Sequence, residues 1–500
     1  MERILLAGGG VVDGSGAEPV KADVLLEDDR IAAVGRIHSA DARRVDCTGL
    51  LVAPGFIDAH SHSDLQVLES RPEKLRQGVT TEVVGNCGFS PYPTGAHATE
   101  LREFANGIFC GGDGWGWASA SQYLDEVQTR AASGVLSLVG HGSLRIAQAG
   151  LHQGPLPARD VEAMAATLDE ALAEGAAGFS TGLMYAPGSS APFDELEALC
   201  RVVARRGKLY ATHMRGYFGS VLEALDEQLE LARRTGCRLQ ISHLQVVGRS
   251  NWPLQPRVLE KIESAKAEGV DVAFDCYPYT AGSTVLTQIL PQAALDGGIG
   301  KLMARLSDPG ERARIAAETE RKLPWDWRDI LISAIGSGAR SDVVGRSIAD
   351  LAAESGRPPV ETVLDLLLAE RGAVNMISFN QSEENLRQTL AHPLSLIISD
   401  GFYVKGRPHP RLAGTFPRLL GTFVREQKLL SIGEAVRKIT RAPADRFGAS
   451  DIGRLEPGAL ADITVFDPDA VGSAADYTDP ERRPAGIHAV FRRGKPVPID

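Results

Sequence analysis

The chain has 500 residues, of which 53 are basic and 64 acidic, so its formal net charge is −11. Apolar types make up 43% and charged types 23%, values typical of an ordinary soluble globular protein. The acidic balance argues against nucleic acid as a partner, and no run of about 18 apolar residues predicts a membrane span.

Two features of the sequence favour the cytoplasm. The N-terminus, MERILLAGGGVVDGSG, lacks the basic region, long apolar core and cleavage site of a secretory signal. The six cysteines form no CxxC pair and no disulfide framework, which is typical of a reducing compartment. They are Cys47, Cys87, Cys110, Cys200, Cys237 and Cys276.

Both ends of the chain have the pattern of β-structure. The first fifty residues are short apolar strands separated by Gly and Asp turns, and the segments 453–468 and 485–497 alternate apolar and polar residues. Chain ends often lie close together in a domain. We therefore predict a small β-sandwich domain built from residues 1–53 plus 449–500.

The middle of the chain repeats a strand followed by a helix. Helical runs at 161–175, 221–236 and 256–269 have apolar residues about 3.6 apart and end in Gly. Strand–helix alternation of this kind predicts parallel βαβ units, and about eight repeats predict a (β/α)8 TIM-like barrel of the α/β class. We expect it to occupy residues 54–280 plus 349–448.

The sequence contains nine candidate strands for the eight positions of the barrel, so one of them must lie outside it. The sequence leaves open whether this is VDVAFDCYPY at 270–279 or AVNMISFN at 373–380. Between 281 and 348 the alternation lapses into a stretch rich in charge and helix formers. We predict an inserted helical subdomain there, which could act as a lid that excludes water.

Polar residues recur at the carboxyl ends of the predicted strands. In a parallel barrel these ends converge on one mouth, where the active site lies. Histidine has no packing reason to recur at that point on separate strands. The residues are Asp58, His60, His62, Cys87, His141, His213, His243 and Asp400.

The types and spacing of these residues indicate a metal site. His60 and His62 are two apart on a strand, so both side chains point to the same face. Cys87, His213 and His243 each end a different apolar strand, and one Cys with two His is a good zinc set. Three protein ligands leave one zinc position for water, as in a catalytic site.

Asp400 and the segment that follows it supply the remaining chemistry. A carboxylate at the mouth could take a proton from metal-activated water and pass it to a leaving group. Residues 401–424 contain no acid and four basic side chains, a local positive field suited to an anionic substrate. The four are Lys405, Arg407, Arg411 and Arg418.

The motifs occur in an order that resembles the amidohydrolase superfamily, and within it the N-acyl-D-amino-acid deacylases, or D-aminoacylases. This resemblance covers nearly the whole chain and implies hydrolysis of an N-acyl-D-amino acid to a carboxylate and a free D-amino acid. The motifs are HSH near 60, GNCG at 85–88, STGLMY at 180–185, ATHMRG at 211–216, ISHL at 241–244, DCYPYTAGST at 275–284, ISDG at 398–401 and HPRLAGTFPRLLG at 409–421.

The resemblance also implies roles for single residues. It implies a tight zinc site of Cys87, His213 and His243, a weaker second metal position at His60 and His62, and Asp400 as general base and acid. It implies that Arg411 holds the substrate α-carboxylate, that Tyr185 assists, and that Tyr277 points at the substrate, although Tyr279 is close by. His141 or Tyr277 could stabilise the oxyanion that develops on the carbonyl oxygen.

One position departs from the family pattern. Well-known D-aminoacylases carry a Lys two residues after the second metal-ligand His, where this chain has Gln245. Gln donates a hydrogen bond without a charge, which leaves the strength of carboxylate binding and the preferred substrate open.

Two other hypotheses are open. The first is a hydantoinase, dihydroorotase or isoaspartyl-dipeptidase-like hydrolase. These relatives bridge two metals with a carbamylated Lys on the fourth strand, and the matching segment here, GAAGFSTGLMY, has no Lys. The second is a barrel retained for binding or assembly, which should have lost metal ligands that this chain retains.

Overall fold

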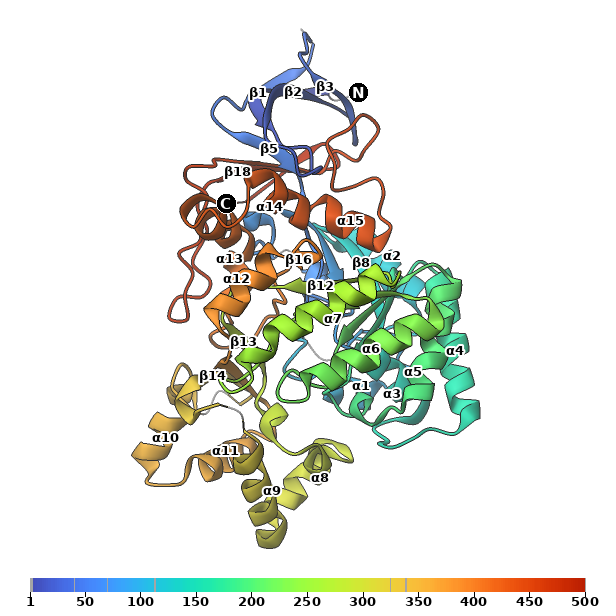
Figure 1. The fold of residues 1–500 in the computed structure, drawn as a ribbon, viewed down its shortest axis with the longest axis vertical. Helices are drawn as coiled ribbons and strands as arrows, with labels where there is room; N and C mark the ends of the chain where they lie inside the picture. Colours follow the sequence, from blue (N-terminus) through green and yellow to red (C-terminus); the bar gives the residue numbers. More distant parts are fainter. Residues whose placement is uncertain are drawn as a thin grey trace.

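The centre of the molecule is a closed barrel of eight parallel strands (Figure 1). The computed structural model describes residues 3–39, 41–69, 71–111, 114–323, 325–337 and 340–499. The barrel strands pair in the order β16-β12-β11-β10-β9-β8-β7-β6, which confirms the predicted TIM-like fold. They are β6 (Phe56–Asp58), β7 (Val79–Val84), β8 (Gly134–Gly140), β9 (Gly178–Gly182), β10 (Leu209–His213), β11 (Arg238–Ile241), β12 (Val272–Cys276) and β16 (Ser395–Ile397).

Amphipathic helices cover the outside of these strands. In α5, for example, Leu196, Leu199 and Val203 are buried on one face and pack in the largest apolar core. Serine side chains accept a backbone N–H bond at the start of α2, α12 and α14, as expected for N-caps. The helices are α1 (Ala98–Ala105), α2 (Ala120–Arg130), α3 (His141–Ala149), α4 (Ala158–Ala173), α5 (Phe193–Arg205), α6 (Val221–Thr235), α7 (Gln255–Ala267), α12 (Glu383–Ala391), α13 (Arg411–Arg418), α14 (Ile432–Ile439) and α15 (Arg441–Phe447).

The barrel closes between its first and last strands, just beyond their ends. Ser61 and Gly401 form a parallel bridge. The Asp400 N–H donates to the His60 carbonyl at 2.8 Å, and the His62 N–H donates to the Gly401 carbonyl at 3.0 Å. These bonds place Asp400 beside the two histidines of the HSH motif, although 338 residues or more separate them in the chain.

The extra strand candidate is AVNMISFN. It forms β15 (Val374–Phe379), the middle strand of an antiparallel sheet with β13 (Ala281–Val285) and β14 (Ile330–Ile335). VDVAFDCYPY supplies β12, the seventh barrel strand. Periodicity does not distinguish the two, because both are short, buried and apolar.

The inserted segment has an apolar core of its own. Helices α8 (Gly298–Ser307), α9 (Pro309–Lys322), α10 (Ile348–Ser355) and α11 (Pro359–Ala369) pack with the three-stranded sheet around one cluster of buried side chains. That cluster includes Leu364 and Met376, so the segment continues past residue 348, where the sequence placed its end. The predicted boundary is wrong because α10, α11 and β15 have the same sequence pattern as a strand–helix repeat of the barrel.

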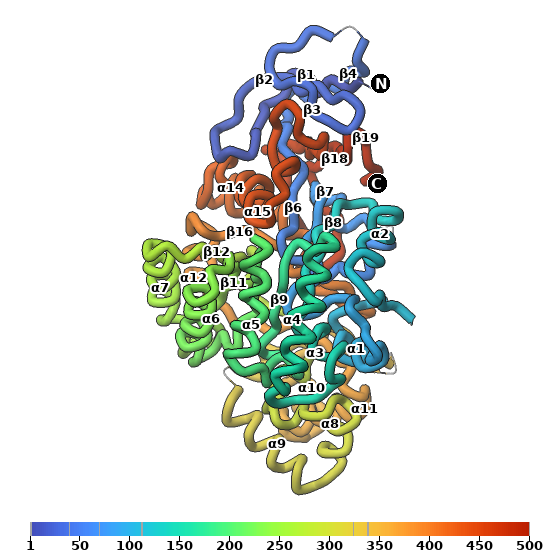
Figure 2. Tube along the Cα trace, turned by 90° about the vertical axis from the view of Figure 1, so that its right-hand side faces the viewer, coloured from blue at the N-terminus to red at the C-terminus, as the bar shows by residue number. Residues whose placement is uncertain are grey.

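Strands from both chain ends form one mixed sheet at the opposite end of the molecule from α8–α11 (Figure 2). The predicted sandwich is thus a single hydrogen-bonded sheet, branched where β4 joins β1. No helix in the described part of the chain has both the length and the apolar character needed to cross a membrane. The strands are β1 (Arg3–Val11), β2 (Val20–Glu27), β3 (Arg30–Gly35), β4 (Arg43–Asp46), β5 (Leu51–Pro54), β17 (Ile463–Phe466), β18 (Ile487–Arg492) and β19 (Lys495–Val497).

Candidate metal centre

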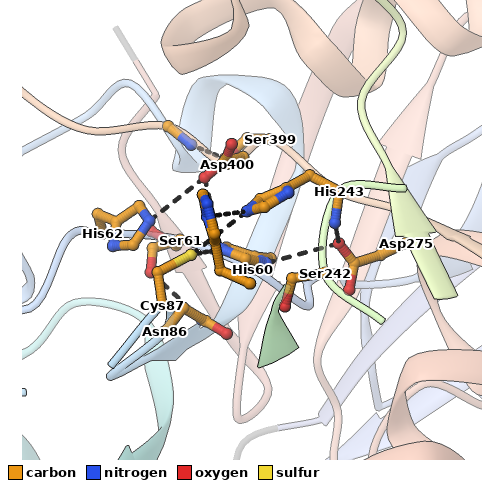
Figure 3. Close-up of polar contacts among 12 residues, drawn as sticks. His60, Ser61, His62, Asn86, Cys87, Ser242, His243, Asp275, Ser399 and Asp400 are labelled. Atoms are coloured by element: carbon orange, nitrogen blue, oxygen red, sulfur yellow. Dashed lines mark hydrogen bonds and ion pairs between the residues drawn. The ribbon is translucent and has the colours of Figure 1, made fainter. Parts of the chain in front are cut away.

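Four of the predicted ligands converge at the barrel mouth, beside Asp400. Figure 3 shows three of them, His60, Cys87 and His243, together with Asp400. The Cys87 Sγ lies 3.3 Å from Nε2 of His60 and 3.4 Å from Nε2 of His243. The His243 Nε2 is also 3.1 Å from Nδ1 of His213. The structure therefore brings together side chains from the ends of β6, β7, β10 and β11.

The spacing of Cys87, His213 and His243 suits one tetrahedral zinc ion. Zn–N bonds of 2.0–2.1 Å and Zn–S bonds of 2.3 Å separate neighbouring donor atoms by about 3.3–3.6 Å. The observed separations of 3.1 and 3.4 Å are close to these edges. Burial lowers the pKa of His243 to about 4, so its ring is neutral, as a ligand must be.

The Cys87 thiol needs a nearby cation if it is to act as a ligand. Burial raises the pKa of its thiol to about 11, despite the opposing effect of the His60 ring. At neutral pH the thiol alone is thus protonated and is a poor ligand. A divalent metal ion supplies the positive charge that makes the thiolate the stable form.

A second group of donors adjoins the first. The Asp400 Oδ1 lies 3.4 Å from Nε2 of His60 and 3.3 Å from Nε2 of His62. His60 and Cys87 belong to both groups, since ligand atoms of His60, His62 and Cys87 also lie within 4.8 Å of one another. The arrangement fits a second metal position that shares ligands with the first.

Three of the site residues have an unusual backbone. Cys87, His243 and Asp400 have φ values of 53°, 35° and 48°, in the left-handed region that side chains other than Gly rarely occupy. Such residues each cost about 1–3 kcal/mol and persist where the surroundings impose them. The turn at Cys87 also packs against Gly182, where a Cβ would lie 1.9 Å from the Cys87 carbonyl oxygen.

Asp275 contacts two of the predicted metal ligands, and the sequence analysis did not single it out. Its Oδ1 lies 3.5 Å from Nδ1 of His60 and accepts the backbone N–H of His243 at 2.6 Å. Gln240 holds the other carboxylate oxygen at 2.9 Å. Asp275 therefore orients two ligands from behind. A carboxylate inside the apolar strand β12 was the signal that could have revealed it.

Asp400 is ionised because its neighbours outweigh its burial. Burial alone would raise its pKa, but the charges of Arg411 and His60 hold the pKa of this carboxyl well below its usual range. The Arg411 Nη1 lies 2.9 Å from the Asp400 Oδ2. Arg411 is itself almost fully buried and stacks on the Tyr277 ring, with its Cζ 4.6 Å from the ring centroid.

Only one of the four basic residues after Asp400 lines the pocket over the metal centre. Arg411 is that residue. Arg418 donates instead to the Pro278 carbonyl at 2.8 Å and packs on Tyr279, while Lys405 and Arg407 are exposed. The charge count of the segment overstated the local positive field because helix α13 turns Arg418 away from the pocket.

Tyr185, Tyr277 and Gln245 all line this pocket, which has about 740 Å³ of empty space, part of it open to solvent. The Tyr277 hydroxyl donates to Oε1 of Gln245 at 3.2 Å and accepts from Nε2 of Gln381 at 3.0 Å. Tyr279 instead donates to the Pro410 carbonyl and does not line the pocket. Gln381 carried no signal in the sequence.

His141 and Asp58 differ from expectation. His141 begins α3, is fully buried and bonds Glu195 at 2.8 Å, so it does not line the pocket and we remove it from the substrate-binding set. Asp58 pairs at 2.5 Å with the buried Lys74, which also bonds Ser399. A position at the end of a barrel strand therefore does not by itself predict that the side chain faces the pocket.

Comparison with known proteins gives matches over nearly the whole chain. A model of the Amidohydrolase family matches residues 43–498. The N-acyl-D-glutamate deacylase of Alcaligenes xylosoxydans xylosoxydans is 38% identical over 496 residues, which are 98% of this chain and 92% of that enzyme. The D-aminoacylase of the same organism is 37% identical over 498 residues, or 99% and 94%.

A solved structure is similar as well. It is the N-acyl-D-glutamate deacylase of Bordetella bronchiseptica, complexed with zinc and a phosphonate inhibitor that mimics the reaction's tetrahedral intermediate. Its TM-score to this chain is 0.85 at 35% identity, and the match covers 99% of this chain and 96% of that one.

Proposed function

The chain belongs to the amidohydrolase family, and from that premise we propose that it is a zinc-dependent deacylase of N-acyl-D-amino acids. The observation that carries the proposal is the convergence of Cys87, His213 and His243 beside the Asp400–Arg411 pair. Donors for one zinc ion, a carboxylate base and a carboxylate-binding cation are the parts that this hydrolysis needs. Its relatives at 37–38% identity act on N-acyl-D-amino acids or are D-aminoacylases.

Cys87, His213 and His243 would hold the zinc ion. His60 and His62, with Asp400 3.3–3.4 Å from both, offer a weaker second position. Bound zinc supplies a Lewis acid, which polarises an amide carbonyl and makes water nucleophilic near neutral pH. The Cys and His donor set suits zinc rather than magnesium or calcium, which prefer oxygen ligands.

Asp400 serves as general base and then as general acid. It is ionised at neutral pH, because the charge of Arg411 lowers its pKa, and Oδ1 faces the metal centre. In this role it accepts the proton of the attacking water and delivers it to the nitrogen of the departing amine. The Asp400 Oδ2 remains with Arg411, which fixes the plane of the carboxylate.

Arg411 binds the substrate α-carboxylate, and Gln245 assists without a charge. Because Gln245 Oε1 accepts from Tyr277, the Gln245 amide turns its N–H donors elsewhere, and we assign them to the carboxylate. Tyr277 has a single hydroxyl proton, so it must release Gln245 before it donates to the oxyanion.

The pocket favours an uncharged amino-acid side chain over that of D-glutamate or D-aspartate. Arg411 is the one cation among the described residues that line it. A second substrate carboxylate would lie among Phe218, Trp325 and Met376 with no cation to balance its buried charge.

Paired substrates test the proposal. Zinc-reconstituted protein should hydrolyse N-acetyl-D-methionine and N-acetyl-D-phenylalanine, act weakly on N-acetyl-D-glutamate and N-acetyl-D-aspartate, and leave the matching L compounds intact. Hydrolysis of only the L compounds, or of hydantoins in preference to linear amides, would overturn it. The fourth barrel strand, Gly178–Gly182, has no lysine that could be carbamylated.

A further inference from the structure

A second cavity adjoins the metal pocket, between the loops of the barrel mouth and the inserted segment. It has about 830 Å³ of empty space, part of it open to solvent. The two cavities share Ile108, Tyr185 and Gln288 as lining residues. The two cavities are therefore neighbours that meet at these three side chains.

The lining of the second cavity is mostly apolar. Its side chains come from the barrel loops and from the start of the inserted segment, and they include Phe104, Leu151, Val285, Leu295, Ile299 and Leu302. Of its two charged residues, Glu103 accepts the backbone N–H of Ile299 at 2.7 Å, and Arg371 is exposed at the rim. The lining also includes the polar side chains of Asn106, Gln153, Thr287 and Gln288, but apolar side chains outnumber the polar ones, which favours an alkyl chain.

Strand β13 connects the Arg411 site to this cavity. The Ser283 carbonyl accepts from Nη2 of Arg411 at 3.2 Å. The next residue, Thr284, hydrogen-bonds the Tyr185 hydroxyl at 3.1 Å, and Val285 lines the second cavity. Residues 283–285 of β13 therefore run from the Arg411 site, past Tyr185, to the second cavity.

The parts of the proposed substrate can be assigned from these positions. The α-carboxylate goes to Arg411, and the amino-acid side chain goes to the apolar wall of Phe218 and Trp325 in the metal pocket. The acyl group then leaves on the remaining side, toward Tyr185, whose ring centre is 4.9 Å from that of His213. Beyond Tyr185 lies the second cavity.

We infer that the second cavity is an acyl-chain subsite and that the enzyme acts on N-acyl-D-amino acids with long straight acyl chains, such as octanoyl or decanoyl. This inference rests on the proposed function, because it assumes that the amide is cleaved at the metal centre. An acetyl group would leave the cavity unused. Each methylene buried there should improve kcat/KM by up to about fourfold, the factor expected from hydrophobic transfer.

A chain-length series tests the subsite. N-acyl-D-methionines with acetyl, butanoyl, hexanoyl, octanoyl and decanoyl groups are assayed at concentrations below micelle formation. The octanoyl compound should exceed the acetyl compound at least tenfold in kcat/KM. Leu151→Trp and Ile299→Trp fill the cavity from two sides, and either should remove this gain while acetyl hydrolysis stays within twofold. Leu259→Trp, a half-buried residue of α7 outside both cavities, is the matched control and should retain the gain.

The possible failures are distinguishable. Efficient acetyl hydrolysis with no gain from longer acyl chains overturns the inference and leaves the proposed function intact. No hydrolysis of any member overturns both. N-acetyl-D-2-aminodecanoate carries the long chain on the amino acid instead. If the two Trp variants impair that substrate and spare the octanoyl series, the cavity is a side-chain subsite and the acyl assignment is wrong.

Discussion

Nη1 of Arg411 lies 2.9 Å from Oδ2 of Asp400, so the cation that we assign to the substrate carboxylate already partners the base. The two oxygens of Asp400 therefore face different groups, since Oδ1 lies 3.3–3.4 Å from His62 and His60. A substrate carboxylate must share Arg411 with Asp400. Substrate binding and proton transfer are thus coupled through one guanidinium.

Asp400→Asn should abolish most of the activity while the tight zinc site stays occupied. The amide keeps the size of the carboxylate but is not a base, so we expect kcat to fall at least about a hundredfold, the lower range for loss of general acid–base catalysis. Zinc at Cys87, His213 and His243 should remain, as measured by metal analysis. Asp226→Asn, an exposed change on α6, is the control. A kcat within tenfold of wild type would contradict the assignment.

Cys87→Ala should abolish the tight zinc site. The variant removes the anionic ligand and leaves two neutral imidazoles, so zinc should be lost on dialysis against a mild chelator that wild type withstands. Circular dichroism should show retained secondary structure, and hydrolysis should be undetectable. Cys200→Ala, which removes a buried thiol remote from the site, is the matched control. Full zinc retention by the Cys87 variant would show that another ligand set holds the ion.

Asp275→Asn should weaken the metal site without removing a ligand. Loss of the charge behind His60 and His243 should reduce zinc affinity or activity by about 10–100-fold, as for other groups that orient metal ligands. Competition with a chromogenic chelator measures the affinity, and excess zinc should restore part of the activity. Affinity and activity equal to wild type would mean that His60 and His243 are held by their backbone alone.

The barrel and the ligand types could be predicted because each depends on short-range patterns. Cys87, His213 and His243 each lie at or just after the end of an apolar run, and such runs can be recognised in the sequence itself. The role of Asp275 was not, because it arises from contacts across strands that are distant in the chain. The end of the inserted segment was also misplaced, since β15 is as short and apolar as β12. His141 has the same position relative to its strand as the ligands, but α3 begins there and directs it toward Glu195.

Gln245→Lys should strengthen binding of the substrate carboxylate. The change adds a cation to a pocket in which Arg411 already pairs with Asp400, so KM for N-acetyl-D-methionine should fall by about threefold to tenfold, the gain typical of a charge-assisted hydrogen bond. Gln245→Met is the comparison variant, and it should raise KM. An unchanged KM in both variants would place the carboxylate away from residue 245.

Lys74→Met should lower thermal stability. Lys74 is almost fully buried and pairs with Asp58, so its loss leaves a buried carboxylate without a cation, which typically costs about 3–5 kcal/mol. We expect a clear fall in the apparent Tm by scanning calorimetry. Removal of Asp58 as well, in Lys74→Met with Asp58→Asn, should recover part of the loss. A Tm equal to that of wild type would mean that burial of Asp58 does not require the Lys74 cation.

The inserted segment supplies part of the wall around the substrate but none of the predicted metal ligands. His213 ends strand β10, and Cys87 and His243 follow strands β7 and β11 in the loops of the barrel mouth. Trp325 and Met376 reach the pocket from the inserted segment. Natural variation within that one segment can therefore retune which compounds enter, while the reaction centre stays unaltered. Exchange of that segment between relatives would then alter the range of amides without changing a predicted metal ligand.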